Sequence, residues 1–201
     1  MIGTFVKDLK NLSGQLLYYA ILIVVFFGVG AVSGNIYFYA GLSIFCGVVA
    51  PLSAVSYDEK DNWDKFALAS GVTRSELAVS RYLLGLSVLL PVWALSFLFF
   101  AIPSFRTAEN LLAVFTFGGL GLIVFDCVLP LIYRIGVEKS RVVYMIVVVA
   151  VMALSVGAAS LVELAGGDPA RVIAGIILAL GVLGVPVSAA VSCRIYRRKD
   201  F

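Results

Sequence analysis

The sequence predicts an all-α membrane protein that forms a single domain over residues 1–201 and crosses the bilayer six times. Three observations support this class. Apolar residues make up 62% of the chain, and the mean hydropathy is +1.06. Charged residues make up only 13%, against roughly 25% in soluble globular domains. The apolar residues also gather in six stretches, each long enough for the ~20-residue helix that a bilayer core requires.

The six predicted spans cover most of the chain. The first has the composition of a signal peptide, but it lacks a small-residue cleavage site and five further spans follow, so we expect it to be retained. The spans are expected at Gln15–Ser33, Ile36–Ser56, Tyr82–Pro103, Leu111–Tyr133, Val142–Val162 and Val172–Cys193.

The connections between the spans differ sharply in charge. Thirteen of the 15 Lys and Arg residues lie on the side that holds both termini, the long segment 57–81 and the loop 134–141. Only Arg106 and Arg171 lie on the other side. Because Lys and Arg collect in cytoplasmic loops, both termini and the segment 57–81 are predicted to be cytoplasmic.

Residues 1–12 have the pattern of an amphipathic helix. Phe5, Leu9 and Leu12 recur at helical spacing, and the charged residues lie between them. Such a helix would rest at the inner interface and turn into the first span. The alternative is a plain flanking segment.

The segment 57–81 is the one sizeable polar block. Its first part favours a short helix, with Trp63, Phe66 and Ala67 on one face and an i, i+4 pair between Asp61 and Lys65. A short charged helix with an aromatic face beneath the membrane is typical of a docking element. A solvated loop whose aromatic rings rest at the lipid headgroups fits equally well.

Two signals mark the end of this helix and the start of the next. Gly71 is placed to serve as a C-cap, since glycine readily adopts the left-handed conformation that ends a helix. Thr73 and Glu76 have the spacing of a capping box, which predicts a new helix running into the third span.

Asp126 is the one ionisable residue within a predicted span. An acid there costs roughly 2.5–3.5 kcal/mol on insertion scales, so it should face the bundle interior, a partner or water. Tyr133, Arg134 and Tyr144 are possible partners. We prefer a polar contact that fixes helix packing, and the alternative is a substrate-path or proton-linked group.

Several function classes are disfavoured by what the sequence lacks. It contains no His and no P-loop motif, and its three cysteines, Cys46, Cys127 and Cys193, fall within or at the ends of apolar runs. We therefore expect no catalytic constellation, no metal site and no disulfide framework. An enzyme is the weakest class, and the basic tail 194–199 suits anionic lipid better than nucleic acid.

Three separated stretches resemble a known family. They are YDEKDNWDKFAL with the following VTR and SRYLLG (57–85), PLIYRIGVEKSR (130–141) and the ending SCRIYRRKDF (192–201). Together they resemble the six-span ABC-2 type transporter permeases, a family that includes exporters of phenol-soluble modulin peptides. This resemblance covers the whole chain and implies the plasma membrane of a bacterium.

The resemblance implies a mechanism in which the permease forms a homo- or heterodimer and each copy rests on a separate cytoplasmic ABC ATPase. ATP and Mg would bind that partner, and this chain would bind no cofactor. The helix from Asp58 to Ala69 would be the coupling helix, seated in a groove of the ATPase. Its expected contact residues are Asp58, Glu59, Asp61, Trp63, Asp64, Lys65 and Phe66, with a second contact at Glu138, Lys139 and Arg141.

The predicted function is therefore the permease subunit of an exporter for an amphipathic peptide or other hydrophobic substrate. The alternative is a membrane interaction protein, such as an immunity or signalling subunit, that uses the same fold without transport.

Overall fold

The computed structural model describes residues 2–164 and 169–198, and every regular element in these ranges is a helix. The all-α prediction is therefore confirmed. The α-helices are α1 (Ile2–Ser13), α2 (Leu16–Ser33), α3 (Tyr37–Lys60), α4 (Trp63–Ala69), α5 (Arg74–Leu95), α6 (Ala108–Ile135), α7 (Val137–Leu164) and α8 (Pro169–Arg197). Two short 3₁₀ turns, η1 (Ser96–Ala101) and η2 (Pro103–Phe105), join α5 to α6.

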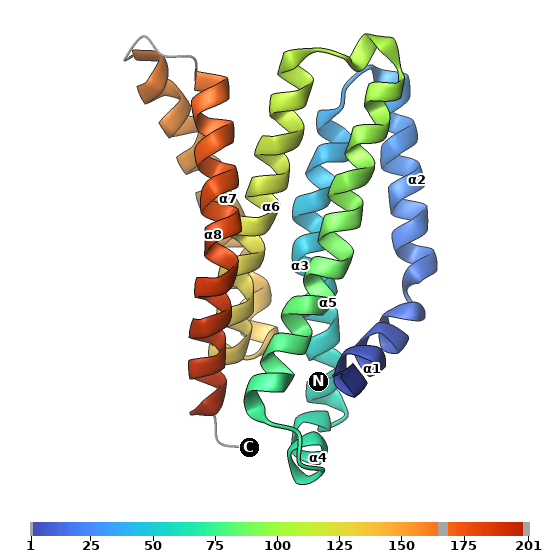
Figure 1. The fold of residues 1–201 in the computed structure, drawn as a ribbon, viewed down its shortest axis with the longest axis vertical. Coiled ribbons are helices and arrows are strands. Elements are labelled where there is room, and N and C mark those ends of the chain that lie inside the picture. Colours follow the sequence, from blue (N-terminus) through green and yellow to red (C-terminus); the bar gives the residue numbers. More distant parts are fainter. Residues whose placement is uncertain (1, 165–168, 199–201) are drawn as a thin grey trace.

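The long helices run side by side along the long axis of the molecule (Figure 1). α6 is the central helix, and it packs most extensively against α8 and α3. One end of the bundle holds α1, α4 and the last turn of α8, whereas the other holds the α2–α3 turn and the 3₁₀ turns (Figure 1). The first end carries most of the basic residues, and we call it the basic end.

The central packing depends on glycines where α6 meets α8. A Cβ atom at Gly119 would lie 2.9 Å from the backbone of Leu178, and one at Gly181 would lie 2.9 Å from the carbonyl oxygen of Gly119. These distances are too short for any side chain, so the two helices can approach this closely only with glycine at both positions.

Within residues 2–164 and 169–198, four helices are long and apolar enough to cross a membrane, namely α3, α5 with η1, α6 and α8. A fifth span results if α1 and α2, which meet at a 64° bend, count together as one. The predicted span Val142–Val162 falls in α7, but the side chains beyond Gly157 lie outside the described residues. The membrane class is thus supported, and the number of six spans stays a prediction.

The α1 helix forms as expected, but it turns a different face inward. Thr4, Asp8 and Leu12, at i, i+4 and i+8, are buried against the bundle, whereas Val6 and Leu9 are exposed. Leu9 was expected on the same face as Leu12. The difference arises because Asp8 joins a buried ionic cluster at the basic end, which fixes the rotation of α1.

The predicted continuous helix from Asp58 to Ala69 is wrong. α3 runs through Asp58 to Lys60, the chain breaks at Asn62, and α4 begins at Trp63. Asn62 has a φ of 50°, a left-handed conformation that asparagine adopts more readily than most residues. The break separates Asp61 from the helix that holds Lys65, and no ion pair joins these two described residues.

Candidate functional site

The α4 helix ends in a well-formed C-cap. After it, the Gly71 N–H donates to the Leu68 carbonyl at 3.1 Å and the Val72 N–H donates to the Ala67 carbonyl at 3.0 Å. Gly71 has a φ of 87°, so the predicted glycine C-cap is confirmed as a Schellman motif.

The capping box at the start of α5 is also confirmed. The Thr73 hydroxyl accepts the Glu76 N–H at 3.3 Å, and the Glu76 carboxylate accepts the Thr73 N–H at 3.0 Å. The short turn between α4 and α5 is thereby fixed by backbone hydrogen bonds at its start and by side-chain-to-backbone hydrogen bonds at its end.

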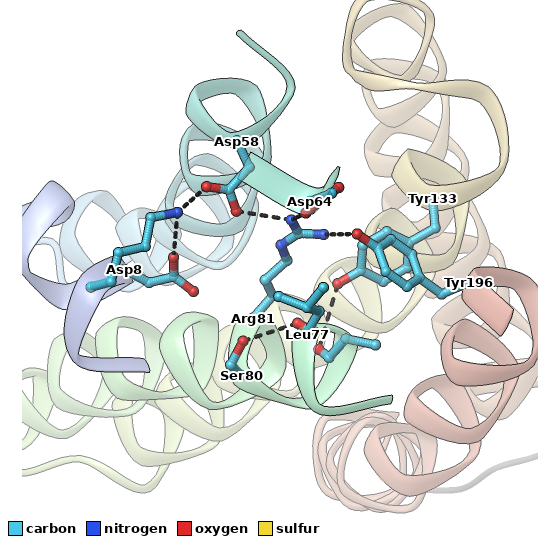
Figure 2. A network of polar contacts seen from close by, with 10 residues as sticks. Asp8, Asp58, Asp64, Leu77, Ser80, Arg81, Tyr133 and Tyr196 are labelled. Atoms are coloured by element: carbon cyan, nitrogen blue, oxygen red, sulfur yellow. Dashed lines mark hydrogen bonds and ion pairs between the residues drawn. The ribbon is translucent and has the colours of Figure 1, made fainter. Parts of the chain in front are cut away.

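The inner face of α4 is tied to the bundle by Arg81 of α5 (Figure 2). Arg81 is only 1% exposed, and its Nη2 donates to Asp58 Oδ2 at 2.8 Å and to Asp64 Oδ1 at 2.6 Å. Asp58 belongs to the end of α3 and Asp64 to the first turn of α4. One guanidinium therefore bridges the two helices that the Asn62 break separates.

Two tyrosines complete the surroundings of this guanidinium. Tyr196 of α8 accepts a hydrogen bond from Arg81 Nη1 at 3.4 Å. The guanidinium carbon lies 5.6 Å from the ring centre of Tyr133 and 5.5 Å from that of Tyr196, within the range of cation–π attraction. The buried charge thus has two carboxylate partners and two aromatic faces.

Lys7 and Asp8 connect α1 to the same place. Lys7 Nζ pairs with Asp58 Oδ1 and lies 3.2 Å from Asp8 Oδ1 (Figure 2). Burial raises the pKa of the Asp8 carboxyl above its ordinary value, and the charge of Asp58 raises this pKa further. We call the seven residues Lys7, Asp8, Asp58, Asp64, Arg81, Tyr133 and Tyr196 the Arg81 cluster; they come from α1, α3, α4, α5, α6 and α8.

The outer face of α4 is open. Phe66 is 62% exposed, and Lys65 and Asp61 are exposed as well. Trp63 is half-buried, and its ring centre lies 5.3 Å from that of Phe66. Lys7 Nζ lies over the Trp63 ring, 4.5 Å from its centre. The exposed patch at α4 therefore combines the exposed ring of Phe66 with charged side chains.

The second predicted contact region lies at the start of α7, next to the end of α3. Glu59 Oε2 accepts the Val137 N–H at 3.5 Å, so this exposed acid caps the α7 N-terminus. Glu138 and Lys139 are exposed in the first turn of α7. Arg141 is also exposed, but it lines a hollow beside α3.

Asp126 lies on α6 and faces the bundle interior as predicted, with only 8% of its surface exposed. Its carboxyl oxygens have no hydrogen-bond partner among the described residues. It is pressed against α8, since a Cβ atom at Gly184 would lie 2.3 Å from Asp126 Oδ2. The nearest hydrogen bond uses its backbone, whose carbonyl accepts from Ser188 Oγ at 2.5 Å.

Comparison with known families now decides the class. The family model described as ABC-2 family transporter protein matches residues 3–197. The chain belongs to this family. Searches of curated proteins and of solved structures find no match. This ABC-2 protein is therefore the membrane permease of an ABC transporter, and membership implies partnership with an ABC ATPase and with the membrane.

The permease brings its predicted contact residues together at the basic end, but it turns them in different directions. Phe66, Lys65, Asp61, Glu138 and Lys139 face outward. Asp58 and Asp64 face inward and are paired with Arg81. Whether any of them touches an ATPase stays a prediction. Among the residues that the structure describes, no group of His, Cys, Asp or Glu side chains could hold a metal ion.

Sequence reasoning missed the centre of the Arg81 cluster. The third span was expected to begin at Tyr82, so Arg81 was counted as one more cation of the basic end. A signal was available, because Asp58, Asp64 and Arg81 border the same short polar segment. Acids and a cation that lie between two spans can reach each other. The positions of Tyr133, Tyr196 and Lys7 beside them depend on the fold and could not be predicted from the sequence.

Proposed function

We propose that this permease is driven by a separate ABC ATPase that docks on the outer face of α4, and that it exports an amphipathic peptide or other hydrophobic substrate. The observation that carries the proposal is the division of α4 into two faces. One face presents Phe66, and the other is anchored through Asp64 to Arg81.

The anchored face would let α4 transmit movement. Asp64 is joined through Arg81 to α3, α5 and α8 by hydrogen bonds and to α6 by a cation–π contact. A displacement of α4 by a closing ATPase would therefore act on the bundle through a buried, desolvated ion cluster. Such clusters have discrete arrangements, which is what transmission between two sites requires.

The second docking contact would come from Glu138 and Lys139, because Glu59 holds the start of α7 beside the end of α3. Twelve of the 14 Lys and Arg residues that the structure describes lie toward this end, which supports its placement in the cytoplasm. We expect a dimer in which two permease copies share the transport path, as the resemblance to the six-span ABC-2 type permeases implies.

The apolar character of the bundle supports the substrate class. A hollow of about 300 Å³ between α6, α7 and α8 is lined by apolar side chains except for Ser155; they include Leu120, Ile123, Val151, Ile173 and Leu180. An apolar hollow of this kind accepts hydrocarbon rather than a hydrated solute. A peptide with one apolar face could therefore pass without its apolar side chains meeting water.

Co-purification of the permease with an ABC ATPase, followed by ATPase assays in nanodiscs, tests the docking. Phe66→Ala should reduce ATPase binding and stimulation by about tenfold, because it removes the exposed aromatic ring at little cost to the fold. Phe38→Ala is the matched control, since Phe38 is 50% exposed but lies at the opposite end of the bundle.

Equal binding by both variants would refute docking through α4. If an ATPase binds and hydrolyses ATP without any export, the chain would instead be a non-transporting interaction, immunity or signalling subunit with the same fold.

A further inference from the structure

A hollow of about 320 Å³ lies at the basic end, apart from both the α4 patch and the Arg81 cluster. It is formed where the α1–α2 junction, the C-terminal part of α3 and the N-terminal part of α7 meet. Its lining residues are Gln15, Leu52, Ser53, Ser56, Tyr57, Lys60 and Arg141. It is half open, so a ligand could enter from the surface.

The lining carries two positive charges and no carboxylate. Among the described residues, neither Lys60 nor Arg141 forms an ion pair. The two acids that precede Lys60 are occupied elsewhere, since Asp58 binds Arg81 and Glu59 caps α7. The hollow is therefore a positively charged space with neutral hydrogen-bonding groups, which suits an anion.

The neutral groups add donors in the same place. Gln15 Nε2 donates to the Tyr57 hydroxyl at 3.0 Å, which leaves the Tyr57 hydroxyl proton available to an acceptor in the hollow. Ser53 and Ser56 contribute two further hydroxyls. A phosphate group accepts hydrogen bonds on several oxygens at once, so it uses this combination of cations and hydroxyls better than a single carboxylate would.

Exposed apolar side chains lie next to the hollow on two of the helices that form it. On α7, the residues after Arg141 expose a stripe at helical spacing, formed by Val142, Met145, Ile146 and Val149, each at least 60% exposed. On α3, Phe45 is exposed and lies seven residues before Leu52, on the same side of the helix. A ligand whose charged group sits in the hollow could thus lay hydrocarbon along both helices.

We propose that this hollow binds the phosphate headgroup of an anionic phospholipid from the leaflet at the basic end. The cations meet the phosphate, and the stripes on α7 and α3 meet the acyl chains. Basic pockets between membrane helices at the cytoplasmic side recognise such headgroups. The inference reassigns Arg141 from ATPase docking to lipid binding and does not depend on the docking proposal.

Native mass spectrometry of the purified permease, equilibrated with equal amounts of phosphatidylglycerol and phosphatidylcholine, tests the site without any ATPase. The intact protein should retain the anionic lipid preferentially. Lys60→Gln with Arg141→Gln should reduce this preference roughly 20- to 30-fold, as two lost basic contacts predict. Lys10→Gln with Arg134→Gln is the control, because it removes the same charge from exposed positions outside the hollow.

The charge-preserving pair Lys60→Arg with Arg141→Lys should retain the preference, which separates lost charge from lost folding. Equal retention of the two lipids, or the same loss in the control pair, would overturn the proposal. Competition by millimolar inorganic phosphate that fully releases the anionic lipid would assign the hollow to free phosphate and also overturn the lipid assignment.

Discussion

Arg81 and Asp126 are both buried ionisable side chains of the bundle, but their surroundings are opposite. Arg81 is 1% exposed and has two carboxylates, a tyrosine hydroxyl and two aromatic faces around its guanidinium. Asp126 is 8% exposed, and its carboxyl oxygens find no hydrogen-bond partner among the described residues.

The difference separates two reasons for burying a polar group. The charge of Arg81 is compensated, so the fold depends on it, because its loss would leave Asp64 without a cation and Asp58 with Lys7 alone. The carboxyl group of Asp126 contributes no bond that the fold needs, so stability does not explain its presence.

Arg81→Met should be the most damaging single substitution. It leaves Asp58 and Asp64 buried without their shared cation, which costs about 3–5 kcal/mol when one partner of a buried pair is removed. The measurement is thermal unfolding in detergent, monitored as the fraction of protein that stays monodisperse in size exclusion after heating. It should show a large fall in Tm.

The control for this substitution is a triple variant in which Asp58→Asn and Asp64→Asn accompany Arg81→Met. Removing the two acids relieves the unpaired charge, so part of the lost stability should return. A triple variant as unstable as Arg81→Met alone would show that packing around Arg81, rather than charge, determines its importance.

Gly184→Ala should destabilise the α6–α8 contact by about 1–3 kcal/mol, since the added Cβ would overlap Asp126 Oδ2 at 2.3 Å. Gly175→Ala on the same helix has nothing within 4 Å of the added atom and serves as the control. Combining Gly184→Ala with Asp126→Ala removes the overlap and should recover the loss. Additive effects in this double-mutant cycle would argue against direct contact.

Asp126→Asn should change the free energy of unfolding by less than ~1 kcal/mol, because the amide has nearly the same shape and no carboxyl hydrogen bond is lost. Export should continue if Asp126 only fixes packing. Normal stability combined with lost export in a vesicle assay would assign Asp126 to the substrate path or to a proton-linked step.

Much of the fold could be predicted because bilayer physics restricts the answer. Helix positions followed from apolar length, and the Gly71 cap and the Thr73 capping box followed from local backbone chemistry. The break at Asn62 could not be predicted, because asparagine occurs within helices as well as in the left-handed conformation. The local sequence does not decide between them.

The candidate site was predicted only in part for a similar reason. The polar segment was recognised, but its residues were assigned to one surface from their type alone. Asp64 and Phe66 are two positions apart and therefore point in different directions on α4. Asp64 is buried because it pairs with Arg81, whereas Phe66 stays exposed. Arg81 follows the turn between α4 and α5, and the sequence does not predict the conformation of that turn.

The smallest expected effect concerns Asp8, whose environment lies between those of Arg81 and Asp126. It has a cation at 3.2 Å, yet burial and the charge of Asp58 raise the pKa of its carboxyl above the ordinary value. The folded protein therefore holds the Asp8 proton more tightly than the unfolded chain does. Its contribution favours folding most below the unfolded pKa of about 4 and is lost as the pH rises through the folded pKa.

Asp8→Asn should remove this contribution to the pH dependence, because the amide cannot ionise and keeps the buried shape. Between about pH 4 and pH 7, the unfolding temperature of the variant should decline less steeply with rising pH than that of the parent protein, because the variant lacks the ionisation of Asp8. Asp61→Asn, at an exposed position in the same region, should leave the slope unchanged. A steeper decline in Asp8→Asn would mean that the Lys7 pair outweighs burial, and Asp8 would then resemble the compensated charge of Arg81 rather than the solitary acid of α6.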